Sequence, residues 1–590
     1  MLGSALSYDE IEREIEKMQS PNPKLREESI DSLYKISKEI GQIYTVQYLL
    51  PFIQKILDTN EEAKVHILHQ IEKVSREVLQ EIKPVYPLYK EIFLTRDDTL
   101  REKAAESLVG SVVHISDRKI DYELYGLEEF ICRLGESRFV MHRISAISLL
   151  RKCLDEIPQH VQLGRLKGLF AGLQKDPLSI VRRKSIACGE ILLYFYTEGE
   201  IREIIEGVLQ DEDDIVRSYF VSPLFLLDKT KENLVFNLKI FKKASGDSSW
   251  KVRSSSTKII KDVILYVYAQ GRESDSGLLQ ESQFKRGSED EGALETSQES
   301  GVSVLECIDR LVEDKEDEVR RSIVERTPEI LKEAPHTKNK ILYIIDKASC
   351  DRSPGVREIV PNILSVISEI ITKEDVALFI SPIIKRLLVD EDQKTKMETI
   401  GKLKTLYSKL GTDAVTDALT PVINDLSSAN WRTRIAVLKS ISSLSRQMSK
   451  KYFYEYLNEP FFKVFIDPIW LVRKEAAAIL AEISINFGAP WVCADMMQSL
   501  EFLKSSRHYA HRISYVTALG KILQTLWPRR VQKLLGKNLL EMADDPIPQV
   551  RLTVAKAARA GILEEKHRIL KHLQDDAHPE VASISGAETE

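Results

Sequence analysis

The side chains that could carry out chemistry in this sequence are few and widely separated. His66 with His69, and His508 with His511, have the i, i+3 spacing of two metal ligands on one helix, but neither pair has further ligands nearby in the sequence. There is also no glycine-rich phosphate loop, no H-E-x-x-H motif and no nucleophile elbow. We therefore interpret these histidines as helix-surface or stacking residues, and we predict a protein that is not an enzyme and holds no cofactor or metal.

A different pattern dominates the chain, in which a short polar residue, usually Asp, is followed six positions later by a basic residue. It occurs fifteen times at an interval near 39 residues, and only the last copy lacks the base, at Ala582. The copies are Ser20 with Arg26, Asp58 with Lys64, Thr95 with Arg101, Ser137 with Arg143, Asp176 with Arg182, Asp211 with Arg217, Asp247 with Arg253, Asp314 with Arg320, Asp351 with Arg357, Asp390 with Lys396, Ser428 with Arg434, Asp467 with Arg473, Ser506 with Arg512, Asp545 with Arg551, and Asp576. Self-similarity at a fixed period predicts a solenoid.

The repeat at residues 452–488 indicates which elements position these pairs. An apolar segment runs into Asp467 and Pro468, and a second one ends at Gly488, so two helices meet at a tight turn. The second helix has one apolar stripe, formed by Val472, Ala476, Ile479, Leu480 and Ile483. We favour the interpretation that Asp467 caps this helix. In the alternative, the acid of one repeat meets the base of the next and sets the stacking register.

Composition restricts the class of protein further. The net charge is −6 with interspersed signs, so nucleic acid is not an expected partner. The six cysteines are scattered, which is typical of reduced thiols in the cytoplasm or nucleus. No apolar run approaches eighteen residues, so we expect no membrane insertion.

One interval between repeats is longer than the others, and the excess falls at residues 270–302. This acidic, Ser- and Gly-rich segment predicts a disordered insertion between repeats 1–7 (residues 1–269) and repeats 8–15 (residues 303–590). Ser288 precedes three acidic residues, the context of an acidophilic kinase site, but a solvated linker is favoured. The last repeat ends in HPEVASISGAETE, which lacks the apolar periodicity of a final helix.

Large aromatic residues recur three positions before the base, at the tip of the intra-repeat turn. They are Trp250, Trp431, Trp470 and Tyr509. Three of them belong to the consecutive repeats 11 to 13, so we favour a row of exposed binding anchors. In the alternative, each ring folds back and packs on its own helix end. Arg432, Lys474 and Arg512 lie beside the rings and suit an acidic or carbonyl-rich partner surface.

The number of repeats and the Trp-x-x-Arg turns at Trp250 to Arg253 and Trp431 to Arg434 carry a resemblance to a known family. The chain resembles the scaffold (A, 65 kDa regulatory) subunits of protein phosphatase 2A, which are HEAT-repeat proteins. The resemblance implies an all-α solenoid, a superhelix or horseshoe of 15 HEAT repeats with about 30 antiparallel-paired helices. It also implies a monomeric, non-catalytic scaffold within a heterotrimer.

By the same resemblance, the turns of repeats 11–15, within residues 411–590, bind the phosphatase catalytic subunit. The implied contact residues there are Trp431, Arg432, Trp470, Tyr509 and His511. Repeats 2–8 receive an exchangeable regulatory (B-type) subunit, with implied contacts at Asp97, Asp98, Arg182, Arg183 and Trp250.

The sequence departs from that family at several turns. The repeat 4 turn carries Arg138 and Phe139 where the family has Trp, the repeat 5 turn carries Ser179 in place of Pro, and the acidic insertion is foreign to the pattern. The alternative function is a HEAT-repeat nuclear transport receptor of the importin-β type. The regular repeat length and the turn tryptophans argue against that alternative.

Overall fold

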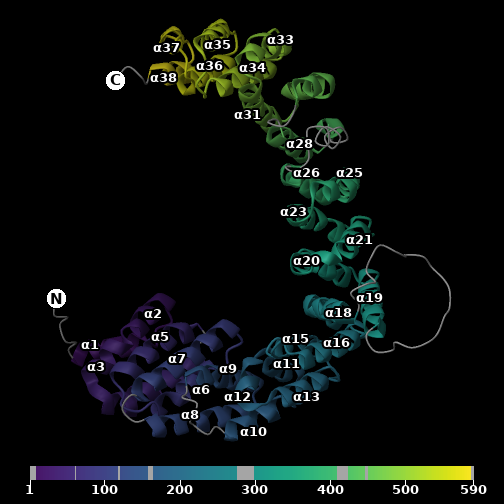
Figure 1. Ribbon diagram of the computed structural model, residues 1–590. Helices are drawn as coiled ribbons and strands as arrows, with labels where there is room; N and C mark the ends of the chain where they lie inside the picture. Colours follow the sequence, from purple (N-terminus) through teal and green to yellow (C-terminus); the bar gives the residue numbers. More distant parts are fainter. Residues whose placement is uncertain are drawn as a thin grey trace. The chain divides into compact units, whose positions relative to one another are not determined.

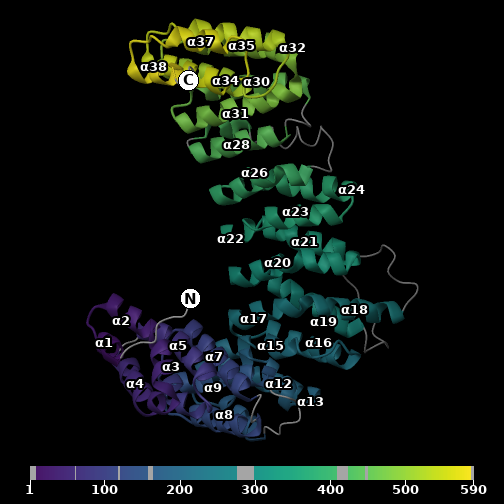
Figure 2. The ribbon, with the colours of Figure 1, turned by 90° about the vertical axis from the view of Figure 1, so that its left-hand side faces the viewer.

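The computed structural model describes residues 8–59, 62–116, 120–156, 164–274, 298–407, 423–428, 430–444 and 449–586. These residues form helices joined by short turns, and no strand occurs among them. The chain divides into two compact units, Met1–Cys307 and Ile308–Glu590. Within each unit the helices follow one another in chain order, as Figures 1 and 2 show. The predicted all-α solenoid is confirmed.

In the first unit, one row of helices consists of the second helix of each repeat, and each helix contacts the next one in the row. This row contains α2 (Pro23–Asp31), α5 (Ala63–Glu77), α7 (Asp98–Ser116), α9 (Val140–Glu156), α11 (Ser179–Ala187), α14 (Asp214–Ser218) and α17 (Trp250–Ser256). The other elements are α1 (Tyr8–Lys17), α3 (Leu33–Tyr44), η1 (Thr45–Leu49), α4 (Leu50–Thr59), η2 (Lys83–Val85), α6 (Tyr86–Ile92), α8 (Ile120–Gly135), α10 (Gly164–Leu173), α12 (Glu190–Phe195), α13 (Glu198–Val208), α15 (Val221–Leu224), α16 (Lys231–Ser245), η3 (Thr257–Ile259) and α18 (Ile260–Ser274). Helix α19 (Gln298–Val312) spans the boundary between the units.

The second unit repeats this plan. Its row of second helices contains α20 (Asp317–Glu333), α23 (Val360–Ile370), α26 (Gln393–Tyr407), α28 (Trp431–Leu444), α31 (Trp470–Phe487), α34 (Tyr509–Ile522), α36 (Pro548–Ala560) and α38 (Pro579–Gly586). The other elements are η4 (Pro335–Thr337), α21 (Lys338–Ser349), α22 (Pro354–Arg357), α24 (Lys373–Asp375), η5 (Val376–Ile380), α25 (Ser381–Leu388), η6 (Asn424–Ser427), α29 (Lys450–Tyr452), η7 (Phe453–Leu457), α30 (Asn458–Lys463), η8 (Val464–Ile466), α32 (Ala489–Trp491), η9 (Val492–Met496), α33 (Met497–Lys504), α35 (Arg529–Met542) and α37 (Lys566–Leu573).

Helix α31 shows how the sequence produces these elements. The five residues of its predicted apolar stripe are all buried, with exposed fractions of 3% or less. The helix ends at Phe487 because Gly488 adopts φ +84°, a conformation that side chains with a Cβ rarely adopt. Both the stripe and the glycine stop are confirmed.

The last repeat differs from the prediction, whereas the predicted insertion is left largely untested. A helix of eight residues, α38, forms in the last repeat, where it buries Val581. Helix α38 packs against α36 and α37, so one deeply buried apolar residue is enough to hold it against them. Most of the predicted insertion at 270–302, including Ser288, lies outside the described residues, which end at Ser274 and resume at Gln298.

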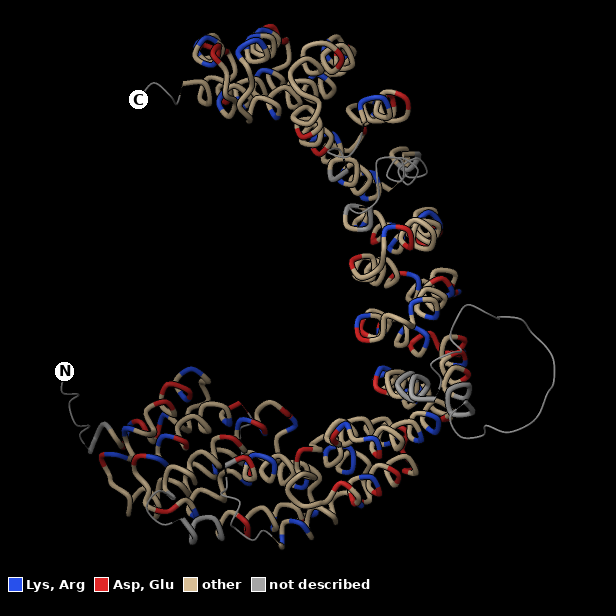
Figure 3. Tube along the Cα trace, in the orientation of Figure 1, with Lys and Arg blue, Asp and Glu red and all other residues tan. Residues whose placement is uncertain are grey.

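The side chains carry charges of both signs along both units (Figure 3). All six cysteines are free thiols. In the described part of the chain, no helix has both the length and the apolar character needed to cross a membrane. The same residues contain no group of three or more His, Cys, Asp or Glu side chains that could hold a metal ion.

Candidate functional site at the intra-repeat turns

The six-residue spacing of acid and base is set by the geometry of the turn. In repeat 5, Arg182 Nη1 donates to the carbonyl oxygen of Asp176 over 2.8 Å, and Asp176 Oδ1 accepts from the Leu178 N–H over 2.9 Å. Repeat 12 has the same arrangement, in which Asp467 Oδ1 accepts from the Ile469 N–H. Helix α31 starts only at Trp470, so Asp467 closes the turn instead of capping the helix. The capping interpretation was therefore wrong.

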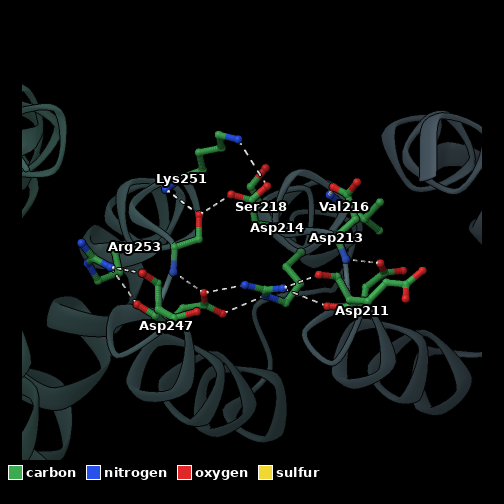
Figure 4. A network of polar contacts seen from close by, with 12 residues as sticks. Asp211, Asp213, Asp214, Val216, Ser218, Asp247, Lys251 and Arg253 are labelled. Atoms are coloured by element: carbon green, nitrogen blue, oxygen red, sulfur yellow. Dashed lines mark hydrogen bonds and ion pairs between the residues drawn. The ribbon is translucent and has the colours of Figure 1, made fainter.

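In eight repeats the remaining donors of this arginine connect neighbouring repeats. Nε and Nη2 both bind the carboxylate that opens the next repeat, at 2.6–3.2 Å. The pairs, which we call rungs, are Arg143–Asp176, Arg182–Asp211, Arg217–Asp247, Arg320–Asp351, Arg357–Asp390, Arg434–Asp467, Arg512–Asp545 and Arg551–Asp576. Figure 4 shows Asp211 and Asp247 in adjacent layers. Each acid meets the base of the preceding repeat, so the predicted direction of the ladder was wrong.

The rungs are largely shielded from water. In the Arg320–Asp351 rung the side chains are only 7% and 9% exposed. Burial alone would raise the pKa of Asp247, but the hydrogen bonds from Arg217 and from the Ser249 N–H outweigh burial and lower it. The hydrogen bond from Arg551 lowers the pKa of Asp576 in the same way. Paired, buried and bidentate rungs therefore fix how one repeat stacks on the next.

The four predicted turn aromatics all occupy the first residue of a second helix. Trp250, Trp470 and Tyr509 start α17, α31 and α34 and are 40%, 44% and 51% exposed. Trp431 starts α28 and is half-buried, because the Arg432 guanidinium lies 4.4 Å from its ring centroid. Helices α28, α31 and α34 are successive neighbours. We call Trp431, Trp470 and Tyr509 the aromatic ridge.

The turn of repeat 12 displays more apolar surface than the sequence analysis anticipated. Ile466, Ile469 and Leu471, close to Trp470 in the sequence, are 42%, 38% and 44% exposed. Their positions on either side of Asp467 and Pro468 could have revealed them, because the apolar stripe of α31 starts only at Val472. The turns of repeats 11, 12 and 13 also hold six basic residues and one acid, namely Arg432, Arg434, Arg473, Lys474, Arg507, Arg512 and Asp467. This surface is apolar at its centre and basic around it.

The other residues predicted for the catalytic-subunit side take different positions. Arg432 is exposed and covers Trp431. His511 is only partly exposed, and its Nδ1 lies 3.0 Å from Ser506 Oγ. Burial, with the nearby His508 and Arg473 charges, lowers the pKa of His511. His511 thus supports its own turn.

The residues predicted for the regulatory-subunit side are not equally available. Asp97 and Asp98 are exposed, and Asp98 pairs with Arg101 over 2.7 Å. Arg182 is 8% exposed and its donors are used within the ladder. Arg182 therefore cannot offer its guanidinium to a partner, whereas the side chain of Arg183 is partly exposed.

No protein-family model matches this sequence, and no curated protein sequence matches it. Solved structures resemble it in fold. Kap121p bound to Pho4p and Kap121p bound to Ste12p have TM-scores of 0.55 and 0.56, with 15% and 16% identity, over 86% of this chain and 52% of theirs. Kap95p with RanGDP has a TM-score of 0.50 and 13% identity, over 98% of this chain and 82% of its own.

These proteins are karyopherins, and Kap95p is yeast importin-β. At such identities the likeness concerns the fold, a HEAT-type helical solenoid. The chain spans about half the length of the Kap121p structures it matches.

Proposed function

We propose that this protein is a non-enzymatic scaffold that binds other proteins along the aromatic ridge. The observation that carries the proposal is the alignment of large aromatic side chains at the first residue of three stacked helices, two of them about half exposed. Exposed aromatic anchors with basic neighbours are typical of protein interfaces. The Arg434–Asp467 rung joins the layers of Trp431 and Trp470, and packing of α31 on α34 joins the layers of Trp470 and Tyr509, so the anchors are held on neighbouring layers.

For the partner, the resemblance of the turns favours the catalytic subunit of a phosphatase of the 2A type, bound at repeats 11–15. A regulatory subunit would then use repeats 2–8 through the exposed residues Asp97, Asp98 and Trp250 and the partly exposed Arg183. In this proposal residues 1–269 form the regulatory-subunit side, and residues 303–590 contain the catalytic-subunit side. The segment 270–302 is proposed as the linker between them.

The second candidate is a nuclear transport receptor. The observation that favours it is the fold likeness to karyopherins, since Kap121p has been solved bound to RanGTP and, separately, to Pho4p. The structures named above are karyopherins and not phosphatase scaffolds. The two candidates differ in the partner they would capture, phosphatase or Ran with its cargo.

The experiment is capture of native partners from cell extract on the full-length chain, with the bound fraction assayed for serine/threonine phosphatase activity and, separately, for binding of purified RanGTP. Trp431→Ala and Trp470→Ala should each weaken capture about 30-fold, because a central aromatic anchor contributes about 2 kcal/mol. Leu526→Ala is the matched control, since Leu526 is 81% exposed but lies outside the turns. Unchanged capture by the double Trp variant, with unchanged circular dichroism, would refute the ridge.

Captured phosphatase activity supports the first candidate. RanGTP binding without phosphatase activity supports the second and overturns the first.

A further inference from the structure

The ladder is interrupted between repeats 12 and 13. Ser506 stands where most repeats have Asp, and the arginine that should face that acid is Arg473. Arg473 is 9% exposed, and its Nη1 donates to the carbonyl oxygens of Asp467 and Pro468 at 2.5 and 3.2 Å. Its Nε has no hydrogen-bond partner, and among the described residues no carboxylate pairs with it. Arg473 is therefore a buried cation without a paired carboxylate: Asp467 of its own turn lies within electrostatic range but is paired with Arg434.

A second interruption, in the first unit, shows how the chain handles the same substitution elsewhere. Ser137 also replaces the acid, and the facing arginine is Arg101, which is 6% exposed. Asp98, three residues before Arg101, supplies a carboxylate at 2.7 Å. The equivalent position in repeat 12, three residues before Arg473, holds Trp470. The missing acid is thus replaced in repeat 3 but not in repeat 12.

Two aromatic side chains of the ridge adjoin the buried Arg473 side chain. The Trp470 ring centroid lies 5.5 Å from the guanidinium carbon, and Tyr509 of the next layer lies within electrostatic range. Both rings are about half exposed. Ser506 Oγ is engaged with His511 Nδ1. Burial lowers the pKa of Arg473, which contrasts with Arg512, whose pKa is raised by its hydrogen bond to Asp545.

We propose that Arg473 is a receptor for the carboxylate of an Asp or Glu side chain on the protein that docks on the aromatic ridge. The proposal rests on the proposed function and specifies the chemistry of the partner. In eight other layers the Nε and Nη2 edge of the equivalent arginine binds a carboxylate, so the preferred ligand of this edge is known from the same molecule.

The energetics favour occupation by a partner. A buried charge without a counter-charge is costly, and a partner carboxylate between Trp470 and Tyr509 relieves that cost. The exposed bases Arg432, Lys474 and Arg507 of the three turns draw an acidic segment to the site, and the bidentate pair with Arg473 then fixes its register.

The test uses the full-length chain and hydrogen exchange of α31 and the first turns of α34. The probes are N-acetyl-glutamate methylamide, its glutamine analogue and inorganic phosphate, each at about 50 mM and matched ionic strength. We expect the glutamate probe to slow exchange about threefold or more, the glutamine probe to have no effect, and Arg473→Gln to abolish the response. Equal responses to both amino-acid probes, or a response to phosphate alone, would overturn the carboxylate assignment.

Ser506→Asp provides a second variant that does not remove the arginine. Because Asp at this position closes a rung elsewhere, it should slow exchange of α31 about tenfold or more without any probe, and it should remove the response to the glutamate probe. Ser506→Asn is the neutral control and should do neither. If Ser506→Asp responds to the probe as the wild type does, the site is not a carboxylate receptor.

Partner capture separates this inference from the proposed function. Ser506→Asp should reduce capture at least about tenfold relative to Ser506→Asn. If Ser506→Asp captures normally while the double Trp variant does not, the ridge stands and the receptor inference fails. If both capture normally, the proposed function itself fails.

Discussion

The ladder is tested most directly at Arg182, because this arginine contacts two acids that differ in burial. Asp211 binds it through both oxygens at 2.8 Å, and the two side chains are 10% and 13% exposed. Glu212 lies 3.4 Å from the same guanidinium but is 86% exposed. The pKa of Arg182 is raised chiefly by its hydrogen bond to Asp211. Asp211→Asn and Glu212→Gln each remove one negative charge beside the same guanidinium, so their effects can be compared directly.

The expected magnitudes differ widely. Removing one partner of a buried ion pair costs about 3–5 kcal/mol, and we take the lower end, about 3 kcal/mol, because about a tenth of this pair is exposed. The Asn side chain can still accept from the Asp213 N–H, as Asp211 does at 2.9 Å, so the turn itself is kept. An exposed pair contributes about 0–1 kcal/mol, so Glu212→Gln should change local stability by less than about 0.5 kcal/mol.

Native-state hydrogen exchange measured on peptides from α11 and α14 is the suitable assay, since stability in a solenoid is a sum of local terms. A loss of about 3 kcal/mol corresponds to exchange about 150-fold faster for Asp211→Asn, against about twofold for Glu212→Gln. Peptides of α36 in the other unit should not change. If the two variants exchange alike, the rungs do not hold the layers together and the argument is wrong.

Two further predictions concern pH and backbone conformation. The pKa values of Asp247 and Asp576 are lowered in the folded chain. Their ionised forms therefore contribute fully to stability above the ordinary aspartate pKa of about 3.9, and this contribution is lost as the pH falls through the lowered folded pKa values. The exchange protection factors of α36 and α38, which correct for the intrinsic pH dependence of amide exchange, should thus be constant from pH 7 to about 5 and fall below about pH 4. Asp576→Asn should flatten this fall, and an unchanged fall would contradict the assignment. Gly488→Ala should destabilise α31 by about 1–3 kcal/mol, because Gly488 has a positive φ. Gly168→Ala should stabilise α10 by about 0.5–1 kcal/mol, because a Cβ at this position meets open space. Thermal unfolding followed by circular dichroism measures both changes, and a shift of the two variants in the same direction would refute this prediction.

Much of the fold could be predicted from the sequence because its causes are local. The period, the apolar stripe of α31 and the positive φ of Gly488 depend on residues within one repeat. The direction of the ladder was not predicted, because the repeat pattern places a base in both neighbouring repeats and does not by itself show which of them faces the acid. The burial of Arg182 was missed for a related reason, since spacing alone does not distinguish it from the partly exposed Arg183.

The candidate site was likewise predicted in part and missed in part. The phase of the turn identified Trp470 and Tyr509 as exposed, because the first residue of each second helix lies outside the apolar stripe. It did not predict that Arg432 would cover Trp431, which depends on side-chain conformation. Nor did it single out Arg473, whose isolation follows from a substitution in the following repeat, at Ser506.

The first residue of each second helix, three positions before the base, is the place where this solenoid can vary without losing its stacking. The backbone N–H of this first residue has no hydrogen-bond partner within the helix, so its residue type is not restricted by helical hydrogen bonding. It is acidic at the start of α7, α14 and α20, where it suits the helix dipole, and proline at the start of α2, α22, α36 and α38, where the missing N–H costs nothing. Only at α17, α28, α31 and α34 is the first residue aromatic. An aromatic side chain neither complements the helix dipole nor removes the unpaired N–H. The turn-closing and ladder bonds come from the residues on either side of it, so neither depends on an aromatic ring at this position, and this agrees with the proposed binding role of the aromatic ridge.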